Sequence, residues 1–165
     1  MLKRSDKIGY IAVISQRCTS LTEKKFTMTS EDLEEIYSEL IADWERLTHD
    51  PSAKITYDTI MQLAKKHNIL GGKWLCSFEY GVDDLWSYLA LSLAATENPM
   101  PCLAAKITPF NDTGVNNYGR KGHMCSVYTE DFTDMDNVFA IEKCLRAVPI
   151  KKDLTYKPGT FKKFT

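Results

Sequence analysis

The sequence predicts an α+β fold, with a curved, mainly antiparallel sheet and helices packed on one of its faces. Apolar side chains repeat with the period of a helix between residues 33 and 44, and with the period of a strand between residues 74 and 80. A polar loop, residues 110–122, joins two more apolar segments, as expected for neighbouring antiparallel strands. The chain has 165 residues, 44% of them hydrophobic, which suffices for one buried core, so we expect one domain over residues 1–165.

The N-terminal third is predicted to hold one strand and two helices. Residues 1–29 comprise a strand at 8–15 and a polar connection. Ser30 can cap the helix that follows, residues 31–48, because its hydroxyl can accept a hydrogen bond from an unpaired backbone N–H of the first turn. One face of this helix carries the apolar residues Leu33, Ile36, Tyr37, Leu40, Ile41 and Trp44. A shorter helix is expected at residues 57–67.

The remainder of the chain is predicted to alternate strands with helices. Residues 73–80 place Trp74 and its apolar alternates on one face of a strand. Asp83 is expected to cap the next helix, which runs to Leu93. A last helix is expected to start at Thr133 or Asp134 and to end near Val148. Three further strands are expected, at residues 102–108, 123–129 and 154–157.

Composition and targeting signals exclude several classes of protein. The net charge of −1 argues against a generally polycationic nucleic-acid coat protein. The apolar stretch near the N-terminus is too short for a secretory signal, and no run approaches the ~18 apolar residues of a membrane helix. The five cysteines form no CxxC pair, and each lies among apolar neighbours, which favours free buried thiols in a reducing compartment. We therefore expect a monomer in the cytoplasm, with the nucleus as the alternative.

Motifs for catalysis and metal binding are absent from the sequence. The three histidines belong to no HExxH motif or paired Cys/His spacing, and no nucleophile with its base and orienting acid can be assembled. Gly114 to Lys121 resembles a phosphate loop, but Arg120 stands where that loop needs lysine, and no helix follows. We therefore expect a protein that is not an enzyme and that holds no cofactor and no metal.

Charge is segregated along the chain. Residues 1–25 carry a net charge of +4 and the last sixteen residues another +4, whereas residues 31–50 carry −7. One interpretation is that the basic ends pair with the acidic helix inside the fold. The other is that the basic ends form a surface for phosphate. The candidate phosphate-binding residues are Lys106, Arg120, Lys121 and Lys157, and the candidate stacking aromatics are Trp44 and Tyr128.

Four segments between residues 55 and 160 resemble a known family. The first two are Lys66 to Trp74, which ends in Gly-Gly-Lys-Trp, and the expected strand Ala104-Ala105-Lys106-Ile107. The other two are the turn Val127 to Asp134, which contains Tyr-Thr-x-Asp-Phe-Thr-Asp, and the C-terminal segment Tyr156-Lys157-Pro158. The turn is the most specific of the four. Together they resemble the uncharacterised family typified by basophilic leukaemia-expressed protein. That resemblance implies a fold similar to the 4E-type cap-binding translation initiation factors.

The cap site of the 4E-type factors has no full counterpart in this sequence. Those factors stack a methylated guanine between two tryptophans, with a carboxylate at its edge. The segment before Gly71, where they place a Trp-Glu pair, reads Lys65 to Leu70 and holds neither residue. Tyr128 falls near an aromatic of that site, and Arg120 and Lys121 fall near its phosphate-contacting loop. The resemblance therefore does not imply ordinary cap recognition.

Two functions remain open from the sequence. The first is binding of RNA or a nucleotide through a basic concave surface. The second is a protein–protein adaptor that uses the acidic helix 31–48 or an exposed edge of the sheet. An enzyme is a distant third.

Overall fold

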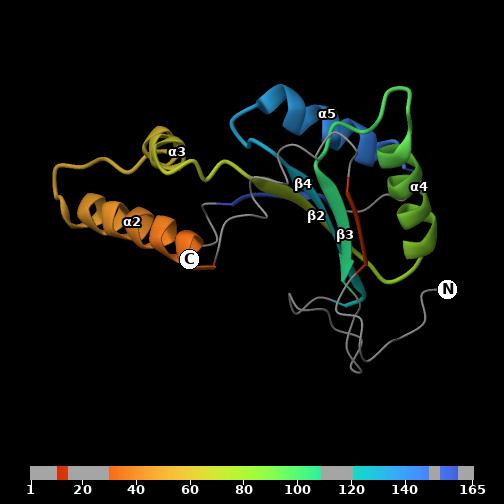
Figure 1. The fold of residues 1–165 in the computed structure, drawn as a ribbon, viewed down its shortest axis with the longest axis horizontal. Helices are drawn as coiled ribbons and strands as arrows, with labels where there is room; N and C mark the ends of the chain where they lie inside the picture. The colour runs from red at the N-terminus through yellow and green to blue at the C-terminus, as the bar shows by residue number, and fades with distance from the viewer. Residues whose placement is uncertain (1–10, 15–29, 109–120, 149–152, 160–165) are drawn as a thin grey trace.

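Five strands form one sheet in the part of the chain that the computed structural model describes, which comprises residues 11–14, 30–108, 121–148 and 153–159 (Figure 1). The order across the sheet is β1-β3-β4-β2-β5, and every neighbouring pair is antiparallel. The strands are β1 (Ile11–Ile14), β2 (Gly72–Phe78), β3 (Ala104–Thr108), β4 (His123–Thr129) and β5 (Thr155–Pro158).

Two helices cover one face of the sheet and enclose the main core. They are α4 (Val82–Ala94) and α5 (Met135–Arg146). The indole N–H of Trp74 on β2 donates a hydrogen bond of 3.1 Å to the carbonyl oxygen of Val138 on α5. The hydroxyl of Tyr88 on α4 donates to the carbonyl oxygen of Cys144, which joins the two helices. Burial of apolar surface between these helices and the sheet is the main source of stability.

Helices α2 (Ser30–His49) and α3 (Tyr57–Lys66) pack on each other at the end of the molecule away from α4 (Figure 1). Their junction is built around Asp43, a buried carboxylate that accepts from Lys66 at 2.5 Å and from His67 at 2.8 Å. Arg46, one turn along α2, pairs with its other oxygen. The hydrogen bonds from Lys66 and His67 lower the pKa of Asp43 to about 2.

A hydrogen bond closes the end of the sheet nearest α3. The hydroxyls of Thr129 on β4 and Tyr156 on β5 lie 2.6 Å apart, and they meet across Gly72 of the intervening strand. A Cβ at Gly72 would lie 2.9 Å from Thr129 Oγ1 and closer still to the Tyr156 hydroxyl. The Tyr156 ring also packs on Trp74, with 5.0 Å between ring centroids. Only glycine leaves room for this arrangement.

Three cysteines lie together in the main core as free thiols. Cys76 and Cys125 face each other across β2 and β4, and Cys102 lies near Cys125. A hydrogen bond with Cys76, together with burial, raises the pKa of Cys125 well above the ordinary value. This placement confirms the expectation of buried free thiols for these three residues.

The expected α+β class, with an antiparallel sheet and helices on one face, is confirmed. The predicted strand at 73–80 ends instead at Phe78, because Glu79 and Tyr80 are exposed in a turn. The prediction that Asp83 caps the following helix is wrong. Gly81 occupies the cap in a left-handed conformation, with φ of 73°, and α4 starts at Val82. Asp83 lies in the first turn, where its charge still favours the helix.

Several expectations fall partly outside the described residues. Of the strand predicted at 8–15, the structure describes residues 11–14, and the whole of the predicted connection after it lies outside the description. The loop predicted at 110–122 also lies outside, apart from its last two residues. The helix predicted at 57–67 and the strand predicted at 154–157 are present within one residue at each end.

Candidate functional site

The face of the sheet turned away from α4 and α5 carries most of the described candidate residues. Successive side chains of a strand point to opposite faces, and Trp74, Cys125 and Ala105 fix the face that belongs to the helix-covered core. The strand register then assigns the other face, which we call the lysine face, to Ala12, Ile14, Lys73, Leu75, Ser77, Ala104, Lys106, Thr108, Met124, Ser126, Tyr128, Thr155 and Lys157.

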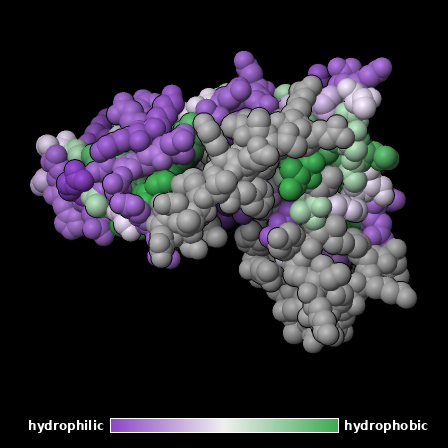
Figure 2. All heavy atoms as spheres, viewed as in Figure 1, coloured by the Kyte–Doolittle hydropathy of each residue, from purple (hydrophilic) through white to green (hydrophobic). Residues whose placement is uncertain are grey.

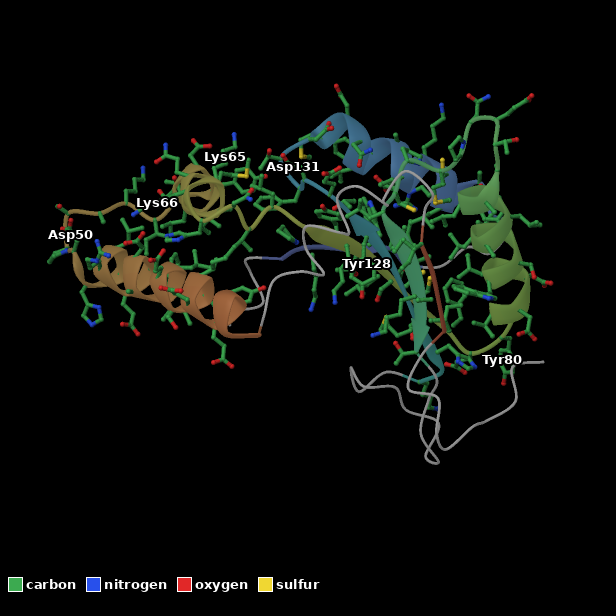
Figure 3. The ribbon with its side chains drawn as sticks, in the orientation of Figure 1. Asp50, Lys65, Lys66, Tyr80, Tyr128 and Asp131 are labelled. Carbon is green, nitrogen blue, oxygen red and sulfur yellow. The ribbon has the colours of Figure 1, made fainter. Side chains whose placement is uncertain are left out.

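One row of this face crosses all five strands, and we call it the Tyr128 strip. Its members are direct partners in the register and run in the order Lys157, Lys73, Tyr128, Ala104 and Ile14. The Nζ of Lys73 lies 5.9 Å from the centroid of the Tyr128 ring, at the outer limit of a cation–π contact. Tyr128 stands near the middle of the sheet (Figure 3). The strip therefore combines an aromatic ring with two cations on one side of it.

Burial separates the strip from the rest of the lysine face. Lys73, Tyr128 and Ala104 are half-buried, and Lys157 and Ile14 at its two ends are exposed. In the next row Leu75 is 3% exposed and Ser126 is 2% exposed. The strip is therefore more exposed than Leu75 and Ser126 in the next row, whereas Lys106 in that row is half-buried.

Lys106 lies one row from the strip and is the third lysine on this face. It is paired with Ser126, so it is two residues along β3 from Ala104 and diagonal to Tyr128. Its side chain is half-buried. Glu130, which follows β4, is an exposed acidic residue at this end of the sheet.

The structure brings together three of the six residues singled out from the sequence. Lys106, Tyr128 and Lys157 share the lysine face, as described above. Lys121 lies beyond the opposite end of β4, seven residues from Tyr128, which is roughly 23 Å at the rise of a strand. Its carbonyl oxygen accepts a hydrogen bond from Ser77 there. Arg120 lies outside the described residues, and Trp44 is half-buried on α2, outside the sheet.

Lys73 is the functional candidate that the sequence reasoning missed. It lies between Lys157 and Tyr128 in the register. The signal was present, because Lys73 alternates with the apolar residues of β2 and must therefore face away from the core. Its partners on β4 and β5 are distant in the sequence, so the alternation alone does not identify the site.

A second charged surface lies on α2. Glu34, Glu35, Glu39 and Glu45 are exposed there, whereas Asp43 is buried and paired. The surfaces of α2 and α3 are mostly hydrophilic in the view of Figure 2. Lys65 and Lys66 project from α3 on this part of the molecule (Figure 3). The pairing of Asp43 with Lys66 neutralises only a part of the acidic segment inside the fold.

Within the described ranges, no group of three or more His, Cys, Asp or Glu side chains could hold a metal ion. In the same part of the chain, no helix has the length and apolar character needed to cross a membrane.

Residues 12–164 match the family described as basophilic leukemia-expressed protein Bles03. The chain belongs to this family. The resemblance seen in the four sequence segments thus extends over nearly the whole chain.

A solved structure of schistosome eIF4E, complexed with m7GpppA and 4E-BP, is similar to the chain with a TM-score of 0.44 and 20% identity. The similarity covers 75% of this chain and 73% of that one. A likeness of this degree says nothing about what the chain binds.

Proposed function

We propose that the chain is a non-enzymatic protein that binds RNA through nucleotide phosphates and bases at the Tyr128 strip. The observation that carries the proposal is the row in the register that sets Lys157 and Lys73 beside Tyr128. Lysine neutralises phosphate, and an aromatic side chain stacks on a base. A half-buried tyrosine with cations beside it provides both interactions on one surface.

Recognition of a methylated cap is not part of this proposal. The residues from Lys65 to Leu70 form the end of α3 and the turn before β2, and they contain no tryptophan. On the described part of the lysine face, Tyr128 is the one aromatic residue. A sandwich of two aromatic rings therefore has no second member there, and we expect capped and uncapped RNA to bind alike.

The test is fluorescence anisotropy of a short labelled single-stranded RNA at low salt. We expect binding that weakens with salt, with a slope of log K against log salt of about −2 for three phosphate contacts. Lys73→Glu combined with Lys157→Glu should weaken binding by at least about tenfold. Free mononucleotide as competitor separates a nucleotide site from an RNA site, and an m7G-capped RNA tests the expectation for caps.

Matched charge reversals elsewhere provide the controls. Lys121→Glu changes the opposite end of β4, and Lys65→Glu changes an exposed position on α3. Neither should alter the affinity by more than about twofold, because both lie away from the strip. No detectable binding at low salt, or an equal loss in the controls, would refute the proposal.

The acidic surface of α2 supports a second candidate, a protein–protein adaptor. Four exposed glutamates on one helix suit a partner with a basic surface. Replacing Glu34, Glu35 and Glu45 with lysine should then abolish capture of a protein partner from a lysate without changing RNA binding. An unchanged set of captured proteins would count against this function.

A further inference from the structure

The Tyr128 strip is polar at one end and apolar at the other. Lys157 and Lys73 occupy the end on β5 and β2, Tyr128 occupies the middle, and Ala104 and Ile14 occupy the end on β3 and β1. Ile14 is 50% exposed, so an aliphatic side chain is accessible at the β1 end of the strip. The chemistry of the strip therefore changes in one direction, from cationic to aromatic to aliphatic.

The dimensions of the strip fit more than one nucleotide. Five adjacent strands span four separations of about 4.8 Å, or roughly 19 Å in all. Tyr128 lies one separation from Lys73, and Ile14 lies two separations further on. A single stacked nucleotide would occupy the lysines and Tyr128 and would leave Ala104 and Ile14 uncovered.

Lys106 stands where a second phosphate would be needed. It is two residues along β3 from Ala104 and diagonal to Tyr128, on the same face as both. The pair Lys73 and Lys157 is suited to one phosphate, and Lys106 is suited to the next. A cation at each of two positions matches a ligand with a terminal and a bridging phosphate.

We infer that the strip binds a 5′-phosphorylated dinucleotide segment in one direction, an inference that rests on the proposed function. The terminal phosphate lies at Lys73 and Lys157, and the first base stacks on Tyr128. The bridging phosphate lies at Lys106. The second base covers Ala104 and Ile14, whose small and aliphatic side chains are apolar partners for its ring.

The test compares three probes by calorimetry or by competition: pApA, ApA and AMP. We expect pApA to bind about tenfold more tightly than either of the others, because ApA lacks the terminal phosphate and AMP lacks the second base. Ile14→Ala should weaken the binding of pApA several-fold and leave the binding of AMP unchanged. Lys73→Ala should weaken the binding of both pApA and AMP and should affect the binding of ApA little.

Controls separate this inference from the proposed function and from misfolding. Ile55→Ala removes a similarly exposed aliphatic side chain from the α2–α3 connection and should change the binding of neither pApA nor AMP. Retained AMP binding shows that the Ile14→Ala protein is folded. If none of the three probes binds, the proposed function fails. If AMP and pApA bind equally, or if Ile14→Ala weakens both to the same degree, the strip still binds nucleotide but the directional dinucleotide mode is refuted.

Discussion

Replacing Gly72 with alanine should destabilise the folded chain through one specific contact. Gly72 is the strand residue over which the hydroxyls of Thr129 and Tyr156 meet at 2.6 Å. A Cβ at this position would lie 2.8 Å from Tyr156 Cζ and 2.9 Å from Thr129 Oγ1. The tyrosine ring can move away only by giving up its hydrogen bond and part of its contact with Trp74.

The expected cost follows from these contacts. Overpacking typically costs ~1–3 kcal/mol and the lost hydrogen bond about 0.5–1.5 kcal/mol, whereas alanine regains about 0.4–1 kcal/mol by restricting the unfolded chain. The free energy of unfolding should therefore fall by about 0.5–4 kcal/mol, which lowers Tm by several degrees near the middle of that range for a chain of this length. Gly71→Ala is the matched control, since a Cβ there would meet only the Thr129 carbonyl oxygen, at 3.9 Å.

The assay is denaturant unfolding of a double-mutant cycle. Tyr156→Phe removes the hydroxyl that crowds the new Cβ, so Gly72→Ala should cost less in that background than in the wild type. We expect a coupling energy of about 1 kcal/mol, since the two residues share one hydrogen-bonded contact. Strict additivity of the two substitutions, or a loss at Gly71→Ala as large as at Gly72→Ala, would refute the packing argument.

Two further predictions concern acid stability and the turn before β4. Because the pKa of Asp43 is about 2 in the folded chain, against an ordinary 3.8, its contribution is complete above pH 4 and is lost as the pH falls through about 2. Asp43→Asn should make the free energy of unfolding, measured by chemical denaturation, less dependent on pH between pH 4 and 2. An unchanged pH dependence would exclude the pairing of Asp43 with Lys66 as its cause. Gly122→Ala should lower the free energy of unfolding, obtained from thermal unfolding, by at least about 2 kcal/mol. The reason is that φ is +82° there and a Cβ would meet the backbone of Phe78. A neutral result would show that the turn can rearrange.

The elements of this fold were predictable wherever the pattern was local. The strand around Trp74 and the helix at 57–67 each follow from side chains within one segment, and both are present. The predicted start of α4 is wrong because the sequence offers Asp83 as a side-chain cap, whereas Gly81 supplies a left-handed backbone with no side-chain hydrogen bond. A backbone conformation of this kind is signalled by the glycine itself.

The candidate site was less predictable because it depends on pairing between distant segments. Lys157 meets Lys73 across 84 positions of the chain, and Lys73 meets Tyr128 across another 55. No periodicity within either segment fixes which residues become partners. Buried Asp43 shows the same difficulty, since its partner Lys66 belongs to the next helix and the acidic segment reads as solvent-exposed. Long-range register was the missing information in both cases.

The facing thiols of Cys76 and Cys125 are buried in the core, so their reactivity reports when that core opens. A thiol reacts as its thiolate, and both burial and the hydrogen bond between the two hold Cys125 in the protonated form. Alkylation of Cys125 must therefore wait until the core between the sheet and helices α4 and α5 opens. The rate at which an added iodoacetamide label appears at that residue would measure how often this core opens, without any dye or engineered probe.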